Sequence, residues 1–204
     1  MNCPISHPPS HRTGNCYISM KATIVLLTLL FSTLSPLPAH SSSFSRSIPK
    51  PAIDYNEQGT TKYQRGDAQG AIKDYDRAIA IDSKYVEAYT NRAVAKLGLG
   101  DAQGAIKDYN RAIDLDPQDA LIYYNRGVAK FELGDNRGAI LDFDRSISLN
   151  PQDAETYSNR GAVKLTIGDK KGAIADLRKG AQLFRQQGQT ADYNKAIELI
   201  RRAK

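Results

Sequence analysis

The chain has 204 residues and the composition of an ordinary globular protein, with 41% hydrophobic and 25% charged residues. Its formal net charge of +6 arises at the C-terminal end, because residues 161–204 hold ten Lys or Arg and four acids, whereas residues 42–160 are nearly neutral. A nucleic-acid-binding protein more often carries a basic stripe along its binding face, so this distribution argues against that class.

The first segment, residues 1–41, predicts an export signal. Lys21 precedes an apolar run over residues 24–34, and two prolines and small polar residues follow it, which is the layout of a secretory signal peptide. The run is short for a membrane span, which needs about 20 apolar residues. We therefore expect a periplasmic, thylakoid-lumenal or secreted protein with a signal at 20–41, preceded by residues 1–19 if Met20 is not the start. An uncleaved membrane anchor is the alternative.

A linker and then a repeat follow the signal. Residues 42–51 are rich in Ser and Pro and predict a linker. The word GDAQGAIKDY begins at Gly66 and again at Gly100, a period of 34 residues that is typical of stacked supersecondary units. In this register the chain divides into four units, at residues 52–85, 86–119, 120–153 and 154–187.

Each unit contains two helical patterns separated by a Gly-Asp pair at unit positions 15 and 16, as at Gly100-Asp101. Glycine tolerates the left-handed conformation that ends a helix, and aspartate caps the exposed amides of the next one. We therefore expect a helix A at unit positions 2–14, a corner, and a helix B at positions 17–30. Pro117 and Pro151 prevent further extension of helix B in the middle units.

Small and large side chains alternate at fixed places in these helices. Gly or Ala recurs at unit position 8 of helix A and Ala at position 20 of helix B, while aromatic residues or Leu recur at positions 4 and 24. This pattern resembles the tetratricopeptide repeat over residues 52–187. The resemblance implies an all-α protein, a right-handed α-solenoid of helix-turn-helix units whose helix A residues line a concave, partner-binding surface. One departure is a Lys at position 11, where we expect the stem to cover the core edge and the ammonium group to lie in water.

Residues 188–204 predict a capping helix. Tyr193, Ala196, Ile197 and Ile200 follow helical spacing on one side, and polar residues occupy the other, as the open end of a stack requires. The cations here could instead contact an anionic membrane or polymer, acting through Lys195, Arg201, Arg202 and Lys204. The protein would then be a peripheral adaptor.

Oppositely charged residues recur in register. Arg92, Arg126 and Arg160 stand in helix A of units 2 to 4, and Asp74, Asp108, Asp142 and Asp176 in helix B of every unit. Because the unit without a predecessor lacks the Arg, we expect each Arg to pair with the Asp of the unit before it. The expected pairs between repeats are Asp74–Arg92, Asp108–Arg126 and Asp142–Arg160.

The resemblance also predicts which residues form the partner-binding groove. Side-chain amides can hold a peptide backbone, since each offers a donor and an acceptor, although they could equally bond within the scaffold. A carboxylate-binding clamp is not expected, because only one of its places has a fitting residue, Asn91. The predicted groove residues are Tyr63, Asn91, Val94, Leu97, Leu121, Tyr124, Asn125, Val128, Phe131, Asn159 and Leu165.

The sequence favours an interaction scaffold over an enzyme. Residues 42–204 contain neither His nor Cys, the side chains that most often serve in acid-base, nucleophilic and zinc chemistry. The sequence also lacks a Gly-rich loop of the kind that binds phosphate. We therefore expect no catalysis, cofactor or metal, and a protein partner held in the groove, in the assembly or positioning of a complex.

Overall fold

The computed structural model describes residues 47–203, and all the regular elements in that range are α-helices. The predicted signal, and residues 42–46 of the predicted linker, lie outside the described residues. The helices are α2 (Lys50–Gln64), α3 (Ala68–Ile81), α4 (Val86–Gly98), α5 (Ala102–Leu115), α6 (Ala120–Glu132), α7 (Asn136–Leu149), α8 (Ala154–Thr166), α9 (Lys170–Gln186) and α10 (Thr190–Ala203).

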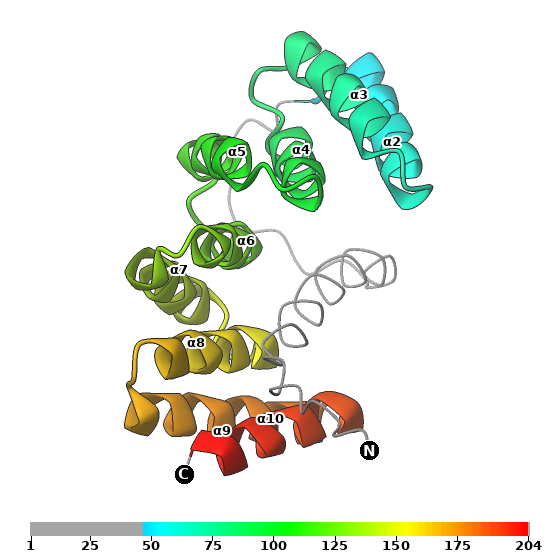
Figure 1. Ribbon diagram of the computed structural model, residues 1–204. Coiled ribbons are helices and arrows are strands. Elements are labelled where there is room, and N and C mark those ends of the chain that lie inside the picture. The colour runs from blue at the N-terminus through cyan, green and yellow to red at the C-terminus, as the bar shows by residue number, and fades with distance from the viewer. Residues whose placement is uncertain (1–46, 204) are drawn as a thin grey trace, which may run out of the picture. The chain divides into compact units, whose positions relative to one another are not determined.

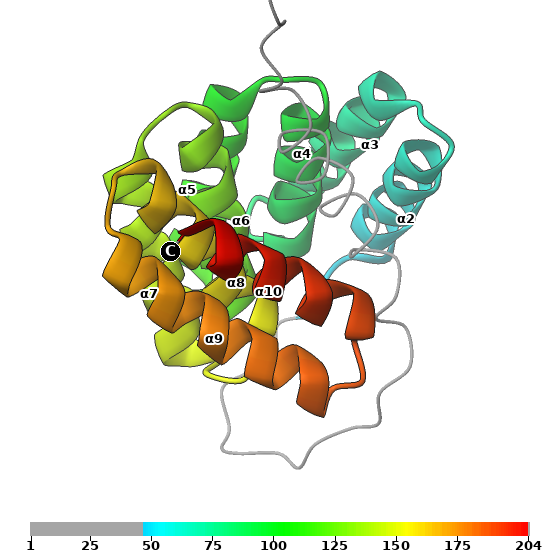
Figure 2. The same ribbon diagram turned by 60° about the horizontal axis from the view of Figure 1, so that its bottom comes forward.

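Consecutive helices pair and the pairs stack, so the all-α solenoid predicted from the repeat is confirmed. Figure 1 shows the A helices α2, α4, α6 and α8 along the inner side of a curved row and the B helices along its outer side. Helix α10 packs on α9 at the end of the row, as Figure 2 shows from below. Among the described residues, none of the helices is both long and apolar enough to cross a bilayer.

The helix boundaries follow local sequence signals and lie within one residue of prediction, except at the two ends of the stack. Helix α2 begins at Lys50, inside the expected linker, because Pro51 lies in its first turn, where a missing N–H costs no hydrogen bond. Helix α9 continues to Gln186, three residues beyond the predicted end, because Arg185 stands where the two middle units have a proline.

The four Gly-Asp corners are confirmed. The glycine of each pair adopts a φ between +81° and +86°, which only glycine tolerates at little cost. The aspartate that follows accepts a hydrogen bond from the backbone N–H three residues on, as Asp101 does from Gly104 at 2.8 Å. In every unit the glycine thus ends helix A, and the aspartate caps the start of helix B.

The core consists of small residues facing large ones, as predicted. In the third unit, a Cβ placed on Gly127 would lie 2.8 Å from Cε1 of Phe143, so a side chain at residue 127 would force the ring to shift. The alanines at unit position 20 are fully buried, and so are the large residues at position 24 in units 2 to 4, which are Tyr109, Phe143 and Leu177.

Tyr109 is a buried residue with an unsatisfied hydroxyl. In the first unit the equivalent Tyr75 donates to Thr60, but the second unit has Val94 at that place, and the Tyr109 hydroxyl has no hydrogen-bond partner among residues 47–203. A buried polar group without a partner costs about 1–3 kcal/mol. We therefore expect Tyr109→Phe to raise the free energy of unfolding, by about 1 kcal/mol, in urea denaturation followed by circular dichroism.

The matched control is Tyr75→Phe, which removes a hydroxyl that does have a partner and should lower stability or leave it unchanged. Phe143 shows that the fold accepts phenylalanine at this unit position. Equal effects of the two substitutions would contradict the assignment of the Tyr109 hydroxyl as unsatisfied.

Candidate functional site

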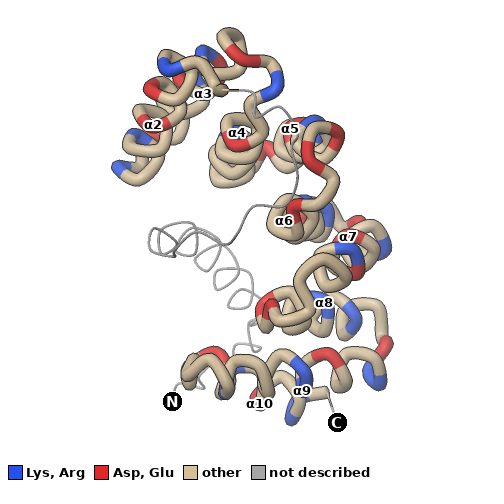
Figure 3. The backbone as a smooth tube through the Cα atoms, turned by 180° about the vertical axis from the view of Figure 1, so that it is seen from behind, with Lys and Arg blue, Asp and Glu red and all other residues tan. Residues whose placement is uncertain are grey.

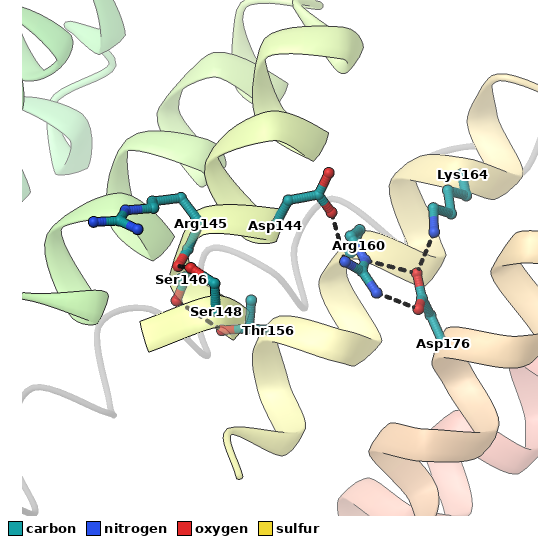
Figure 4. Close-up of polar contacts among 8 residues, drawn as sticks. All are labelled: Asp144, Arg145, Ser146, Ser148, Thr156, Arg160, Lys164 and Asp176. Atoms are coloured by element: carbon teal, nitrogen blue, oxygen red, sulfur yellow. Dashed lines mark hydrogen bonds and ion pairs between the residues drawn. The ribbon is translucent and has the colours of Figure 1, made fainter. Parts of the chain in front are cut away.

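The Arg and Lys residues in the middle of the A helices point toward the B helices. In the third unit, Arg126 donates from Nε and Nη2 to the two oxygens of Asp142, at 2.9 and 2.7 Å, and Lys130 lies 2.8 Å from the same carboxylate. Asp142 is 4% exposed. The same geometry recurs at Arg92 with Asp108 and at Arg160 with Asp176, and Figure 4 shows the last of these together with Lys164.

The predicted pairing between repeats is therefore wrong, because each Arg binds the Asp of its own unit. Asp108 occupies unit position 23, on the side of helix B that faces its own helix A, where Arg92 and Lys96 lie one turn apart and both reach it. Asp74 of the first unit is instead bound by Lys62 and Arg77. The predicted partners Asp74–Arg92, Asp108–Arg126 and Asp142–Arg160 do not meet.

A link between repeats exists two residues further along helix B. Arg92 donates from Nη1 to Asp76 at 2.6 Å, and Arg160 donates to Asp144 at 2.5 Å. Residues two apart on a helix point about 200° apart. On one helix B, the residue at unit position 23 therefore contacts helix A of its own unit, and the residue at position 25 contacts helix A of the next unit. Each guanidinium also stacks on a tyrosine of its own helix, as Arg126 does on Tyr123.

The lysines at position 11 also differ from expectation. Lys96, Lys130 and Lys164 have side chains only 19–22% exposed, and their ammonium groups bind the unit's aspartate instead of lying in water. The carboxylate at the core edge accepts the hydrogen bonds of the ammonium group, which water would accept if the lysine were exposed. As a result, the paired cations of α4, α6 and α8 are drawn away from the inner side of the row.

The inner side carries a polar ladder between neighbouring A helices. Asn91 donates to Oδ1 of Asn56 at 3.0 Å, and Asn56 in turn donates to Glu87 at 3.2 Å. At the other end of the row, Asn159 donates to the Tyr124 hydroxyl at 2.8 Å. For Asn91 and Asn159, the alternative of bonding within the scaffold is thus confirmed.

The ladder is interrupted in the middle, between α4 and α6. By its register, Asn125 should bond to residue 90, but Thr90 is short and donates its hydroxyl back to the carbonyl of Val86. Asn125 is 5% exposed and forms no hydrogen bond within residues 47–203. Beside it Leu121 replaces the glutamate found in the flanking units and is 51% exposed.

The predicted groove residues fall into three groups. Leu121 is exposed, while Tyr63, Asn91, Phe131, Asn159 and Leu165 are half-buried. The remaining five are buried, which makes them part of the packing as much as of a surface: Val94, Leu97, Tyr124, Asn125 and Val128. Their role in partner binding stays a prediction.

Glu155 is an inner-side residue that the sequence prediction missed. It stands at unit position 2, which it shares with Glu87 and Leu121, so the repeat register could have found it. Burial above all, and then the charges of Asp153 and Asp192, raise the pKa of its carboxyl to about 7, against the lowering effects of the Tyr124 hydroxyl at 3.5 Å and of Lys195. This carboxylate is therefore poorly compensated when it is ionised.

Residues 47–203 contain no cluster of His, Cys, Asp or Glu that could hold a metal ion. The inner side offers polar side chains for hydrogen bonds and the exposed Leu121 for an apolar contact.

Comparison with known proteins identifies the repeat. The sequence model described as "TPR repeat" matches residues 59–100 and 97–134, and the model described as "Tetratricopeptide repeat" matches residues 120–153. The solved second TPR domain of human RPAP3, in complex with the HSP70 peptide SGPTIEEVD, is 30% identical, with a TM-score of 0.54 over 56% of this chain and 95% of that one. The chain belongs to the tetratricopeptide repeat family.

Other tetratricopeptide repeat structures extend the likeness. The first TPR of Spaghetti (RPAP3), bound to the HSP90 peptide SRMEEVD, is 26% identical over 58% of this chain and 94% of that one, with a TM-score of 0.57. A crystal structure of MamA, 24% identical, covers 76% of this chain and 90% of that one with a TM-score of 0.62, which shows the fold alone. We found no match among curated protein sequences. Proteins of this family are generally scaffolds for protein–protein interaction.

Proposed function

We propose that this tetratricopeptide repeat protein binds a peptide segment of a partner protein along the inner side of α4, α6 and α8, and so helps to assemble or position a complex. The observation that carries the proposal is the interruption of the polar ladder. Asn125 forms no hydrogen bond with another residue in the described part of the chain, and it lies beside the exposed Leu121. The predicted export signal leads us to propose that this happens after export.

The energetics favour an added chain at this place. A peptide backbone offers both the donor and the acceptor that the side-chain amide of Asn125 can bind. An apolar side chain of the same segment would cover Leu121, which removes apolar area from water. The complexes of RPAP3 with chaperone peptides support a peptide as the ligand class.

The basic C-terminal end is a weaker candidate for a binding surface. Lys195 pairs with Asp192 at 2.8 Å and Arg202 with Glu198 at 2.9 Å, both within α10. These acids offset the cations that an anionic membrane or polymer would need. Binding that persists as ionic strength rises would support the groove over this surface.

The test uses two exposed leucines on opposite sides of the row. A photo-cross-linking residue is placed at Leu121 on α6 or at Leu141 on α7, which are 51% and 67% exposed. We expect Leu121 to capture a partner that Leu141 does not capture. The partner's captured segment, made as a peptide, should then bind about tenfold more weakly to Asn125→Ala, because one hydrogen bond is lost.

Asn194→Ala, on the exposed face of α10, is the control and should bind as the unchanged protein does. Equal capture at the two leucines, or equal affinity of the two asparagine variants, would contradict a groove centred on Asn125. Circular dichroism of each variant separates a binding defect from a folding defect.

A further inference from the structure

The inner side of the row has an uneven charge composition. Its residues lie at unit positions 2, 5, 6, 9, 12 and 13 of the A helices, and none of them in any of the four units is Lys, Arg or His. Four are glutamates, at Glu57, Glu87, Glu132 and Glu155. The protein as a whole has a formal net charge of +6, so this acidic inner side is opposite in sign to the molecule that carries it.

The structure explains where the cations of the A helices go. Arg126 and Lys130 both bind Asp142 on α7, and the corresponding residues of α4 and α8 do the same with α5 and α9. These cations are committed to the layer behind the A helices. They are therefore not available to neutralise a ligand on the inner side.

The negative charge is concentrated where α8 meets α10. Figure 3 shows acidic residues at the N-terminal ends of both helices, which pack against each other. Glu155 faces the Tyr124 hydroxyl of α6, Asp153 at the start of α8, and Asp192 and Lys195 of α10. Lys195 is the one cation among these neighbours, and it already pairs with Asp192 at 2.8 Å.

We propose that the segment bound by the inner side is neutral to basic, and that a Lys or Arg side chain of that segment pairs with Glu155 while a neighbouring apolar side chain covers Leu121. This inference rests on the proposed function. A positive charge beside Glu155 replaces the solvation that the carboxylate loses, whereas an acidic segment would add a further like charge to three carboxylates. Asn125, one turn along α6 from Leu121, takes the backbone of the same segment.

This ligand is opposite in charge to the two RPAP3 peptides, SRMEEVD and SGPTIEEVD, which both end in the acidic sequence EEVD. Recognition of such a tail needs cations on the inner side. Here the inner positions nearest the middle hold Asn91, Leu121 and Asn125, and none of them can pair with a carboxylate as an ion. The same fold is thus adapted to a different ligand charge.

The first experiment is a selection. A random library of twelve-residue peptides, displayed on phage, is selected on the immobilised full chain and on its Asn125→Ala variant. We expect Lys and Arg, with an apolar residue nearby, to be enriched over Asp and Glu in peptides that need Asn125. Enrichment of Asp and Glu, or the absence of a charge preference, would overturn the charge inference and leave the proposed function standing. A failure to select any peptide dependent on Asn125 would count against the proposed function itself.

The second experiment measures affinity for the strongest selected peptide. Glu155→Gln should weaken its binding about tenfold, and replacing the peptide's Lys or Arg by Gln should weaken binding equally in the unchanged protein. Glu198→Gln, on the outer side of α10, removes the same charge and should change affinity little. Equal effects of the two glutamate variants would show only a general charge effect and refute the assignment. The peptide substitution keeps the test valid even if Glu155→Gln is unstable.

The pH dependence supplies an independent readout. Burial and its acidic neighbours raise the pKa of Glu155 to about 7, so this carboxyl becomes ionised between about pH 6 and pH 8. A cationic peptide binds the ionised form better, so affinity should rise with pH across that interval. All three histidines precede residue 42, so the repeat units contain no histidine that could cause the same pH dependence. The rise should disappear in Glu155→Gln, and a pH dependence that survives in this variant would assign it to another group.

Discussion

Asp142→Asn is expected to lower the free energy of unfolding by about 3 kcal/mol, the largest effect we expect from a change of a single polar atom in this protein. The carboxylate of Asp142 is 4% exposed and binds both Arg126 and Lys130. Asparagine keeps the size of the side chain but removes the charge, which leaves two poorly solvated cations facing each other. Urea denaturation monitored by circular dichroism measures the change.

Asp144→Asn is the matched control. Asp144 accepts a hydrogen bond from Arg160 of the next unit, but its side chain is 48% exposed, so the pair should contribute only about 0–1 kcal/mol. A loss as large as that for Asp142→Asn would mean that burial does not set the strength of these pairs.

A pair of double-mutant cycles tests which aspartate Arg126 uses. Arg126→Met combined with Asp142→Asn should show strong coupling, above about 1 kcal/mol, because the two side chains share two hydrogen bonds. Arg126→Met combined with Asp108→Asn should be additive within about 0.5 kcal/mol. The reverse result would restore the pairing between repeats that the sequence had suggested.

Phe143→Ala is expected to cost about 3–5 kcal/mol, the range found when a fully buried aromatic side chain is truncated. Phe143 is 0% exposed, fills the space left by Gly127, and lies against Tyr124 with the ring centroids 6.0 Å apart. A large cavity would remain between α6 and α7, because the backbones of two packed helices cannot close around it.

Phe143→Leu is the natural control, since the fourth unit has Leu177 at the same place. This change should cost less than about 1.5 kcal/mol. Because each unit packs only on its neighbours, weakening the third unit should also uncouple the two ends of the stack and reduce the slope of the denaturation curve. A Phe143→Ala protein that unfolds with unchanged midpoint and slope would contradict the central place given to this unit.

Much of the fold could be predicted from the sequence because the signals that set it are local. The φ of Gly100 and the cap at Asp101 depend on residues within one turn, so a repeated Gly-Asp predicts a repeated corner. The same holds for the facing of Gly127 and Phe143, which follows from their fixed places in two adjoining helices. Because the pattern repeats every 34 residues, the structure predicted for one unit applies to every unit of the stack.

Side-chain partners across helices could not be predicted in the same way. In the repeat register, Arg92 lies near both Asp74 and Asp108. The rotation of each helix B about its axis decides which acids reach Arg92. They are Asp108 of its own unit and Asp76, rather than Asp74, of the unit before. A rotation of this kind is set by packing over the whole helix, which no short motif encodes.

The sequence by itself therefore determined the class of fold and the positions of the corners, and it predicted a set of groove residues. Only the tertiary structure decided that Asn91 and Asn159 are used within the scaffold, whereas Asn125 keeps an unused amide beside an exposed leucine. The physical reason is that a hydrogen bond forms only when its donor and acceptor lie within about 3 Å of each other. Residues 35 apart in the chain come within that distance only after the helices have stacked.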